Sequence, residues 1–209
     1  FDGLNLTWET LEGLVKHNGP VTNNIPQTIS DLNDKFNLSL NEYASLEAQI
    51  ASIADDIAYN NHDVDDGLRA GFFTYQELRD LPLIGNIIKE LPESFENRDI
   101  QRINNEITRR STAQMVNDVL SNIETNVENN GIKDILGIRK HDTAIASFTT
   151  KMQSDVDTIR EFLSERMYNH EKVRNMSKNA EKTISALYDL LIDDQDLIYF
   201  KLKIKKDDK

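Results

Sequence analysis

Apolar residues recur at the helical period along most of the chain, and the clearest example is "SLEAQIASIADDIAYNNHDVDDGL", residues 45–68. Leu46, Ile50, Ile53 and Ile57 follow one another at spacings of four, three and four. This spacing places them on one face of an α-helix. We therefore expect a helix here, with this aliphatic face in the core.

The opposite face of the same predicted helix combines alanines with acidic residues. Asp55, Tyr59 and Asp63 follow each other at intervals of four, after Ala48 and Ala51. Small alanines let another segment approach closely, so we expect this second face to be covered as well. Burying an unpaired carboxylate costs several kcal/mol, and a metal cation or a bound ligand would remove that cost. The alternative is a helix face whose acids are simply solvated.

The rest of the chain also favours helices. The capping-box pairs Ser39/Glu42 and Thr74/Glu77 predict two helix starts. The stretch 21–37 is expected to be a loop with at most a short turn, and the alternating residues 197–206 could form one short C-terminal strand. Helices are expected over residues 6–17, 39–68, 97–129, 148–176 and 178–192, and a short helix is expected to begin at Thr74. The fold class is therefore all-α, as one helical unit over residues 1–209.

Length, charge and cysteine content exclude several classes of partner and site. The chain has 209 residues, a formal net charge of −12 and no cysteine. The negative charge makes nucleic acid or an anionic membrane an improbable partner, and disulfides and thiolate zinc sites are excluded. No apolar run is long enough to cross a bilayer, and no signal peptide is recognisable, so we expect a cytoplasmic protein. The chain starts at Phe1 rather than at methionine, which suggests part of a longer protein.

Most catalytic signatures are absent. The sequence contains no glycine-rich phosphate loop, no G-x-S-x-G and no H-E-x-x-H. Its four histidines include two His-Asp dipeptides, at His62-Asp63 and His141-Asp142. A His-Asp dipeptide alone is weak evidence for a site.

Four segments carry a family resemblance: "GLNLTWETLEGLVKHNGP", "SLEAQIASIADDIAYNNHDVDDGLRAG", "RRSTAQMVNDVL" and "FLSERMYNHEKV". In this order they resemble the bacterial deoxyguanosine triphosphate triphosphohydrolases, within the HD-domain metal phosphohydrolases. The resemblance implies an HD-domain-like helical bundle, hydrolysis of a deoxynucleoside triphosphate to deoxynucleoside and tripolyphosphate, and a homo-oligomer. It also implies that residues 1–71 complete the HD catalytic core and that residues 72–209 form a C-terminal helical region.

The resemblance also assigns roles to the acidic face. In that family a divalent metal, Mg²⁺ or Mn²⁺, is held by a His, a His-Asp pair and a distant Asp that opens a D-x-x-x-Y-x-x-x-D pattern. Asp55, Tyr59 and Asp63 match this pattern. Asp55 would be the metal ligand, and Tyr59 and Asp63 would face the sugar. A hard carboxylate suits these ions.

The chain departs from the family where the remaining ligands should be. The family's first His and its His-Asp pair belong upstream of "GLNLTWETLEGL", so we expect this chain to be the C-terminal half of such an enzyme and inactive alone. His62-Asp63 and His141-Asp142 are interpreted as unrelated to the metal. Some distant relatives have Lys after the metal-binding Asp, where this chain has Asp56.

Several other residues leave alternatives open. Lys16 and His17 could face a ligand or cap a helix C-terminus. Arg109 and Arg110 could reach a triphosphate or a neighbouring subunit, or could pair with glutamates on a solvated face. The remaining candidates are expected to have packing roles: Trp8 in the core, and Arg166, Met167, Tyr168 and His170. The rival hypothesis for the whole chain is a non-catalytic helical interaction or oligomerisation module.

Overall fold

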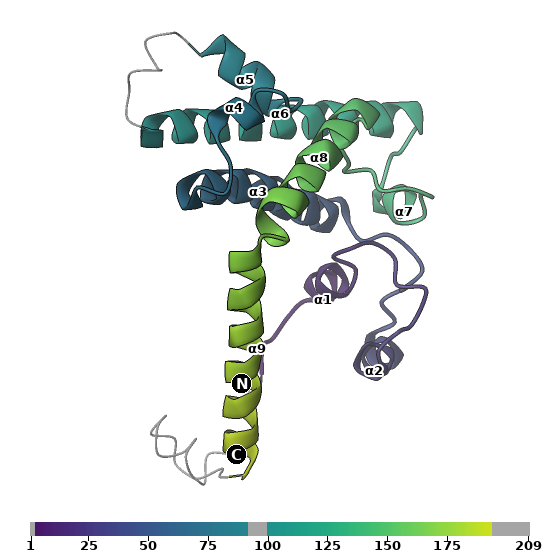
Figure 1. The fold of residues 1–209 in the computed structure, drawn as a ribbon. Coiled ribbons are helices and arrows are strands. Elements are labelled where there is room, and N and C mark those ends of the chain that lie inside the picture. The colour runs from purple at the N-terminus through teal and green to yellow at the C-terminus, as the bar shows by residue number, and fades with distance from the viewer. Residues whose placement is uncertain (1–2, 92–99, 194–209) are drawn as a thin grey trace. The chain divides into compact units, whose positions relative to one another are not determined.

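The computed structural model describes residues 3–91 and 100–193, and the described part is all-α, as predicted (Figure 1). No strand occurs in these ranges. The possible strand over residues 197–206 lies outside the described residues. Its helices are α1 (Trp8–Val15), α2 (Gln27–Phe36), α3 (Leu46–Ala70), α4 (Tyr75–Leu78), α5 (Ile84–Glu90), α6 (Ile100–Asn129), α7 (Ile135–Arg139), α8 (Thr150–Leu163) and α9 (Glu171–Asp193), with a π-helical turn at Ser164–Tyr168.

The chain divides into two compact units, Phe1–Glu161 and Phe162–Lys209. The division at residue 71, which the family resemblance implied, stays a prediction. No described helix is both long enough and apolar enough to span a bilayer.

The first unit is organised around α3 and α6, which pack against each other along much of their length (Figure 1). The core includes Leu78, Ile87, Ile107, Met115 and Val156, each with at most 2% of its surface exposed. Helix α5 packs on α6, and α1 packs on α3. This arrangement leaves the long side of α3 opposite α6 available for a site.

Polar side chains join the irregular connections to these helices. Gln49, which is buried in α3, accepts the backbone N–H groups of Ile145 and Ala146 on its Oε1, at 2.8 and 3.2 Å. Its Nε2 donates to the carbonyl of Ala44 at 2.9 Å. In the same way, Asp118 of α6 accepts the N–H and the hydroxyl of Thr149, just before α8 begins. These bonds satisfy backbone groups that no helix satisfies.

Helices α1 and α3 approach each other closely. An ideal Cβ added to Gly13 would lie 3.1 Å from the Cβ of Ala48. A side chain at residue 13 would therefore press against α3. This close approach brings the second half of α1 to the first turn of α3.

Several predicted boundaries need correction. The capping box at Thr74/Glu77 is confirmed. The predicted start at Ser39 is wrong: α3 begins at Leu46, its N-cap is Ser45, and Ser39 has a positive φ of 48°. Residues 27–36, expected within a loop, form the ten-residue helix α2. The helix predicted over residues 148–176 instead passes into the π-helical turn and breaks at Asn169, before α9.

Candidate functional site

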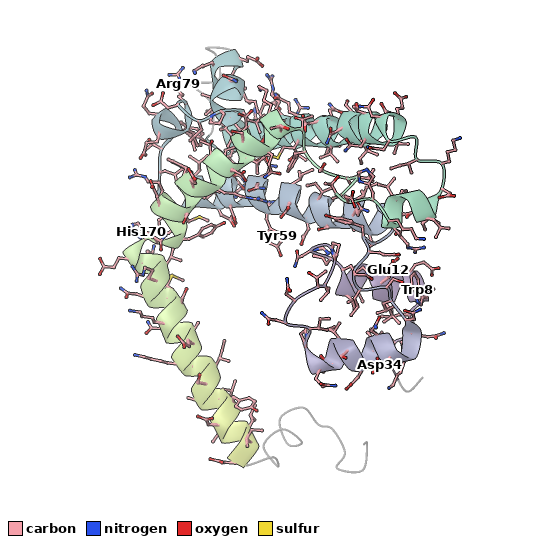
Figure 2. The ribbon with its side chains drawn as sticks, turned by 90° about the vertical axis from the view of Figure 1, so that its right-hand side faces the viewer. Trp8, Glu12, Asp34, Tyr59, Arg79 and His170 are labelled. Atoms are coloured by element: carbon pink, nitrogen blue, oxygen red, sulfur yellow. The ribbon has the colours of Figure 1, made fainter. Side chains whose placement is uncertain are left out.

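Tyr59 lies on the side of α3 that is turned away from α6 (Figure 2). Asp55 and Asp63, four residues before and after Tyr59, share this side of the helix. The Asp55 side chain is 50% exposed and Tyr59 is 63% exposed, while Asp63 is partly buried. Three side chains that can bind a metal or a sugar are therefore accessible together. The spacing of the three residues in the sequence predicts this shared side of α3. The roles of their side chains stay predictions.

The predicted partition of α3 into two covered faces is wrong. Ile57 is buried, as expected, but Ile50 is 40% exposed. Helix α1 covers the alanine and aspartate face at Ala48, but within the described ranges the face is open beyond it, since Ala51 and Asp55 are exposed. The buried side instead carries Gln49, Asn60, Asn61, Val64 and Gly67 together with Ile57. Polar residues on this buried side obscured it in the apolar pattern.

His17 lies beside Asp55, just after the end of α1. Its Nε2 is 3.7 Å from Oδ2 of Asp55, and both side chains are about half exposed. The His17 imidazole is therefore a direct neighbour of the candidate metal-binding carboxylate. The sequence singled out His17, but its spacing gave no indication that Asp55 is its neighbour.

Lys16, the residue before His17, has a different environment. It is the C-cap residue of α1, and its Nζ donates to Oε1 of Glu12 at 3.1 Å. Glu12 also accepts two hydrogen bonds from Arg139 of α7, at 2.7 and 3.0 Å. The Arg139 guanidinium lies over the ring of Trp8, 4.9 Å from its centre. Burial lowers the pKa of Lys16 below its ordinary value of 10.5, and the hydrogen bond to Glu12 opposes this shift.

This ion cluster of Glu12, Lys16 and Arg139 fixes the end of α1 that precedes His17. Glu12 is fully buried and Lys16 is 2% exposed. The Lys16 ammonium is therefore turned toward Glu12. Of the two roles open to Lys16, the structure favours the one at the helix C-terminus.

Two cavities flank His17. One, of about 310 Å³, lies between the loop after α1, α3 and residues 144–146, and is lined by Lys16, His17, Tyr43, Gln49, Ser52 and Asp56 among others. The other, of about 560 Å³, lies between α1, α3 and α7. Its lining includes Leu14, His17, Ala48, Ala51 and Ile135. The surroundings of His17 are thus concave on both sides, as expected of a ligand site, whereas Asp55 lines neither of these two cavities.

Asp56, the residue after Asp55, is paired with Arg160 of α8. The Arg160 guanidinium is 3.2 Å from Oδ1 of Asp56 and donates through Nε to Oδ1 of Asn60, also at 3.2 Å. Reasoning from the sequence missed Arg160, because nothing local relates α8 to this part of α3.

The residues around Asp55 do not make a complete metal centre. Within the described ranges, no group of three or more His, Asp or Glu side chains is placed to hold a metal ion. Asp55 can supply one carboxylate ligand. His17, whose Nε2 lies 3.7 Å from that carboxylate, can supply one nitrogen ligand. A hard divalent cation needs more oxygen or nitrogen ligands than these.

The other sequence candidates occupy ordinary structural positions. His62 is exposed on α3, and Nδ1 of His141 lies 3.2 Å from the backbone nitrogen of Thr143 in a loop. Arg109 and Arg110 both pair with Glu106, which confirms the solvated-face alternative. Trp8 is only partly buried and donates to the carbonyl of Phe36 at 2.8 Å. Met167 is buried in the π-helical turn, whereas Arg166, Tyr168 and His170 are exposed.

Comparison with protein families finds a match at the C-terminal end of the chain. Residues 146–207 match the family described as the phosphohydrolase-associated domain. This match covers α8, α9 and the segment that follows.

Comparison with individual proteins is more specific. The chain is 42% identical over 202 residues to a deoxyguanosinetriphosphate triphosphohydrolase-like protein of Caulobacter sp. (strain K31), covering 95% of this chain and 51% of that protein. A protein with the same description in Bradyrhizobium sp. (strain ORS 278) is 42% identical, covering 90% of this chain and 48% of that protein. Another, in Rhizobium meliloti (strain 1021), is 38% identical, covering 95% of this chain and 51% of that protein. The resemblance expected from the sequence is confirmed: the chain is homologous to these proteins and spans about half their length.

Proposed function

We propose that this chain is part of a metal-dependent phosphohydrolase that converts dGTP, or another deoxynucleoside triphosphate, to a deoxynucleoside and tripolyphosphate. The observation that carries the proposal is the accessible row of Asp55, Tyr59 and Asp63 on α3, within a chain about 40% identical to proteins described as deoxyguanosinetriphosphate triphosphohydrolase-like. The proposed protein is cytoplasmic and homo-oligomeric, as the sequence led us to expect.

Each of the three side chains has a chemical role in this proposal. Asp55 supplies one carboxylate to Mg²⁺ or Mn²⁺, hard ions that prefer oxygen ligands. The aromatic ring of Tyr59 packs against the deoxyribose, where a 2′-hydroxyl would be crowded. Asp63 accepts a hydrogen bond from the 3′-hydroxyl. The bound metal would polarise the phosphoryl group and activate water.

The remaining metal ligands come, in this proposal, from sequence beyond the matched half. The curated relatives are about twice as long as the stretch they share with this chain. The open side of α3 and the cavities around His17 offer a surface on which such a segment could complete the site. We therefore expect the 209-residue chain alone to be inactive.

The test uses the complete protein that contains this sequence. With dGTP and Mn²⁺ it should release tripolyphosphate, detected by anion-exchange chromatography. Asp55→Ala should lower turnover by at least about a hundredfold, because even ligand-orienting residues are worth about ten- to hundredfold. Tyr59→Ala and Asp63→Asn should chiefly raise KM. Asp34→Ala, at an exposed carboxylate on α2, is the matched control and should behave as wild type.

The alternative function is a helical module for interaction or oligomerisation, without chemistry of its own. One observation favours it: α9 exposes apolar side chains that include Met176, Ile184, Leu187 and Tyr188, at 63%, 67%, 52% and 64%. If the complete protein releases no tripolyphosphate from any deoxynucleoside triphosphate, this alternative replaces the enzymatic one. Equal activity of Asp55→Ala and Asp34→Ala would remove Asp55 from the site.

A further inference from the structure

Arg160 of α8 lies against the flank of α3, next to the row of Asp55, Tyr59 and Asp63. Its guanidinium contacts two residues of α3, Asp56 and Asn60, each at 3.2 Å. Its third partner is Asp157, one turn earlier on α8, at 3.8 Å. Arg160 is therefore anchored to the helix that carries the candidate site.

The two contacted residues directly follow two site residues in the sequence. Asp56 follows Asp55, and Asn60 follows Tyr59. At about 100° per residue, positions 56 and 60 form a second row beside positions 55 and 59. Arg160 thus runs along the edge of the site and leaves the site residues uncovered.

Asn60 is held so that its carbonyl oxygen is presented to Arg160. It is 5% exposed, and its Nδ2 donates to the backbone carbonyl of Asp56 at 2.7 Å. Its Oδ1 accepts a hydrogen bond from Nε of Arg160. A fixed acceptor beside a carboxylate gives the planar guanidinium a defined position.

Arg160 lies in a strongly negative part of the chain. The stretch 55–66 of α3 contains five aspartates, and the whole chain carries a net charge of −12. A triphosphate carries several negative charges and would be repelled by a carboxylate next to the site. A cation at Asp55 would offset that residue's own charge and leave the charge of Asp56 to be balanced by another group.

We propose that Arg160 is a positioning residue which, by neutralising Asp56, allows a polyphosphate to bind beside Asp55. This inference rests on the proposed function. It assigns to Arg160 an indirect role, through Asp56. A direct contact between Arg160 and a phosphate is a different hypothesis, and so is a purely structural role.

The first experiment needs no catalysis and uses the 209-residue chain. Arg160→Gln, Asp56→Asn and the double variant are unfolded in urea, and the midpoints are compared as a double-mutant cycle. The midpoint losses should be non-additive, because the two residues share one ion pair. Additive losses would show that the pair does not form and would overturn the inference. Lys151→Gln, which removes one positive charge from an exposed ion pair on the same helix, is the control.

The second experiment measures KM for dGTP with the complete protein. Arg160→Gln should raise KM about tenfold with little change in kcat, and Arg160→Lys should stay close to wild type. Asp56→Asn introduced into Arg160→Gln should bring KM back toward the wild-type value, because it removes the charge that Arg160 balances. Lys151→Gln should leave KM unchanged.

The results of these experiments distinguish a failure of the Arg160 inference from a failure of the proposed phosphohydrolase function. A wild-type protein that releases no tripolyphosphate would overturn both. An active protein in which the double variant is as impaired as Arg160→Gln would overturn the inference alone, and would point to a direct phosphate contact or to a structural role. An active protein whose KM does not respond to Arg160→Gln would also overturn the inference alone.

Discussion

Glu12 is the residue whose replacement should most directly weaken the first unit. Its carboxylate is fully buried and accepts three hydrogen bonds, one from Lys16 and two from Arg139. Glu12→Gln keeps the size of the side chain but removes its charge. Buried Lys16 and partly buried Arg139 would then lose the carboxylate that both contact.

The size of the effect follows from this burial. Removing one partner of a buried ion pair costs about 3–5 kcal/mol, because an uncompensated charge remains. Removing Lys16 instead leaves Glu12 with both hydrogen bonds from Arg139, and an apolar residue of similar length would fill the space. We therefore expect Glu12→Gln to lower the free energy of unfolding by about 3–5 kcal/mol and Lys16→Met by about 1 kcal/mol or less.

The assay is urea unfolding followed by the fluorescence of Trp8, the single tryptophan of the chain, and by circular dichroism. Trp8 lies under the Arg139 guanidinium and so reports directly on the cluster. A loss below about 1 kcal/mol for Glu12→Gln, or equal losses for the two variants, would refute the reasoning that buried charge decides the cost.

Lys16 should also make stability depend on pH. Burial lowers its pKa in the folded chain below the ordinary 10.5. Between these two values the unfolded chain binds more protons, so the free energy of unfolding should rise as the pH is raised through this window. The rise should be absent from Lys16→Met when both proteins are unfolded in urea across the alkaline range.

Three further changes test other contacts. The arginines beside Glu106 lower its pKa from 4.5 to about 2, so its stabilising effect should be present above pH 4.5 and be lost as the pH falls toward 2. Glu106→Gln should remove that dependence in acid-unfolding curves. Gln49→Leu leaves the buried N–H of Ile145 and that of its neighbour unsatisfied and should cost about 2–4 kcal/mol in urea unfolding. Gly85→Ala would place a Cβ 2.3 Å from the carbonyl oxygen of Arg79 and should lower stability by about 1–3 kcal/mol in the same assay.

The parts of the fold that could be predicted are those with strong local signals. The long apolar period of α6 and the capping box at Thr74 each lie within one stretch of sequence, and both are confirmed. The start of α3 was misplaced because Ser39 and Ser45 are both acceptable cap residues, and the packing of the preceding segment selects Ser45. Helix α7 has five residues, too few to show an apolar period. Helix α2 does carry Ile29, Leu32 and Phe36 at helical spacing, but the polar residues around them favoured a loop.

The candidate site was predictable only within one helix. Spacing alone places Asp55 and Tyr59 on the same side of α3, because the period of a helix is fixed. The neighbours of these residues come from elsewhere: His17 follows α1, and Arg160 belongs to α8. Such contacts depend on how the helices pack, which periodicity does not encode. The buried ion cluster escaped prediction for the same reason, since Arg139 reaches Glu12 from α7.

The close approach of Gly13 to Ala48 has an implication for how this protein can vary. Since a methyl group at residue 13 would already lie 3.1 Å from the Ala48 side chain, the two positions cannot both grow. Sequences that keep this fold should therefore have small side chains at positions 13 and 48. A larger residue at one of these positions should be accepted only with glycine at the other. A library randomised at both positions would show whether this exchange occurs, and so whether the distance between His17 and Asp55 is under selection.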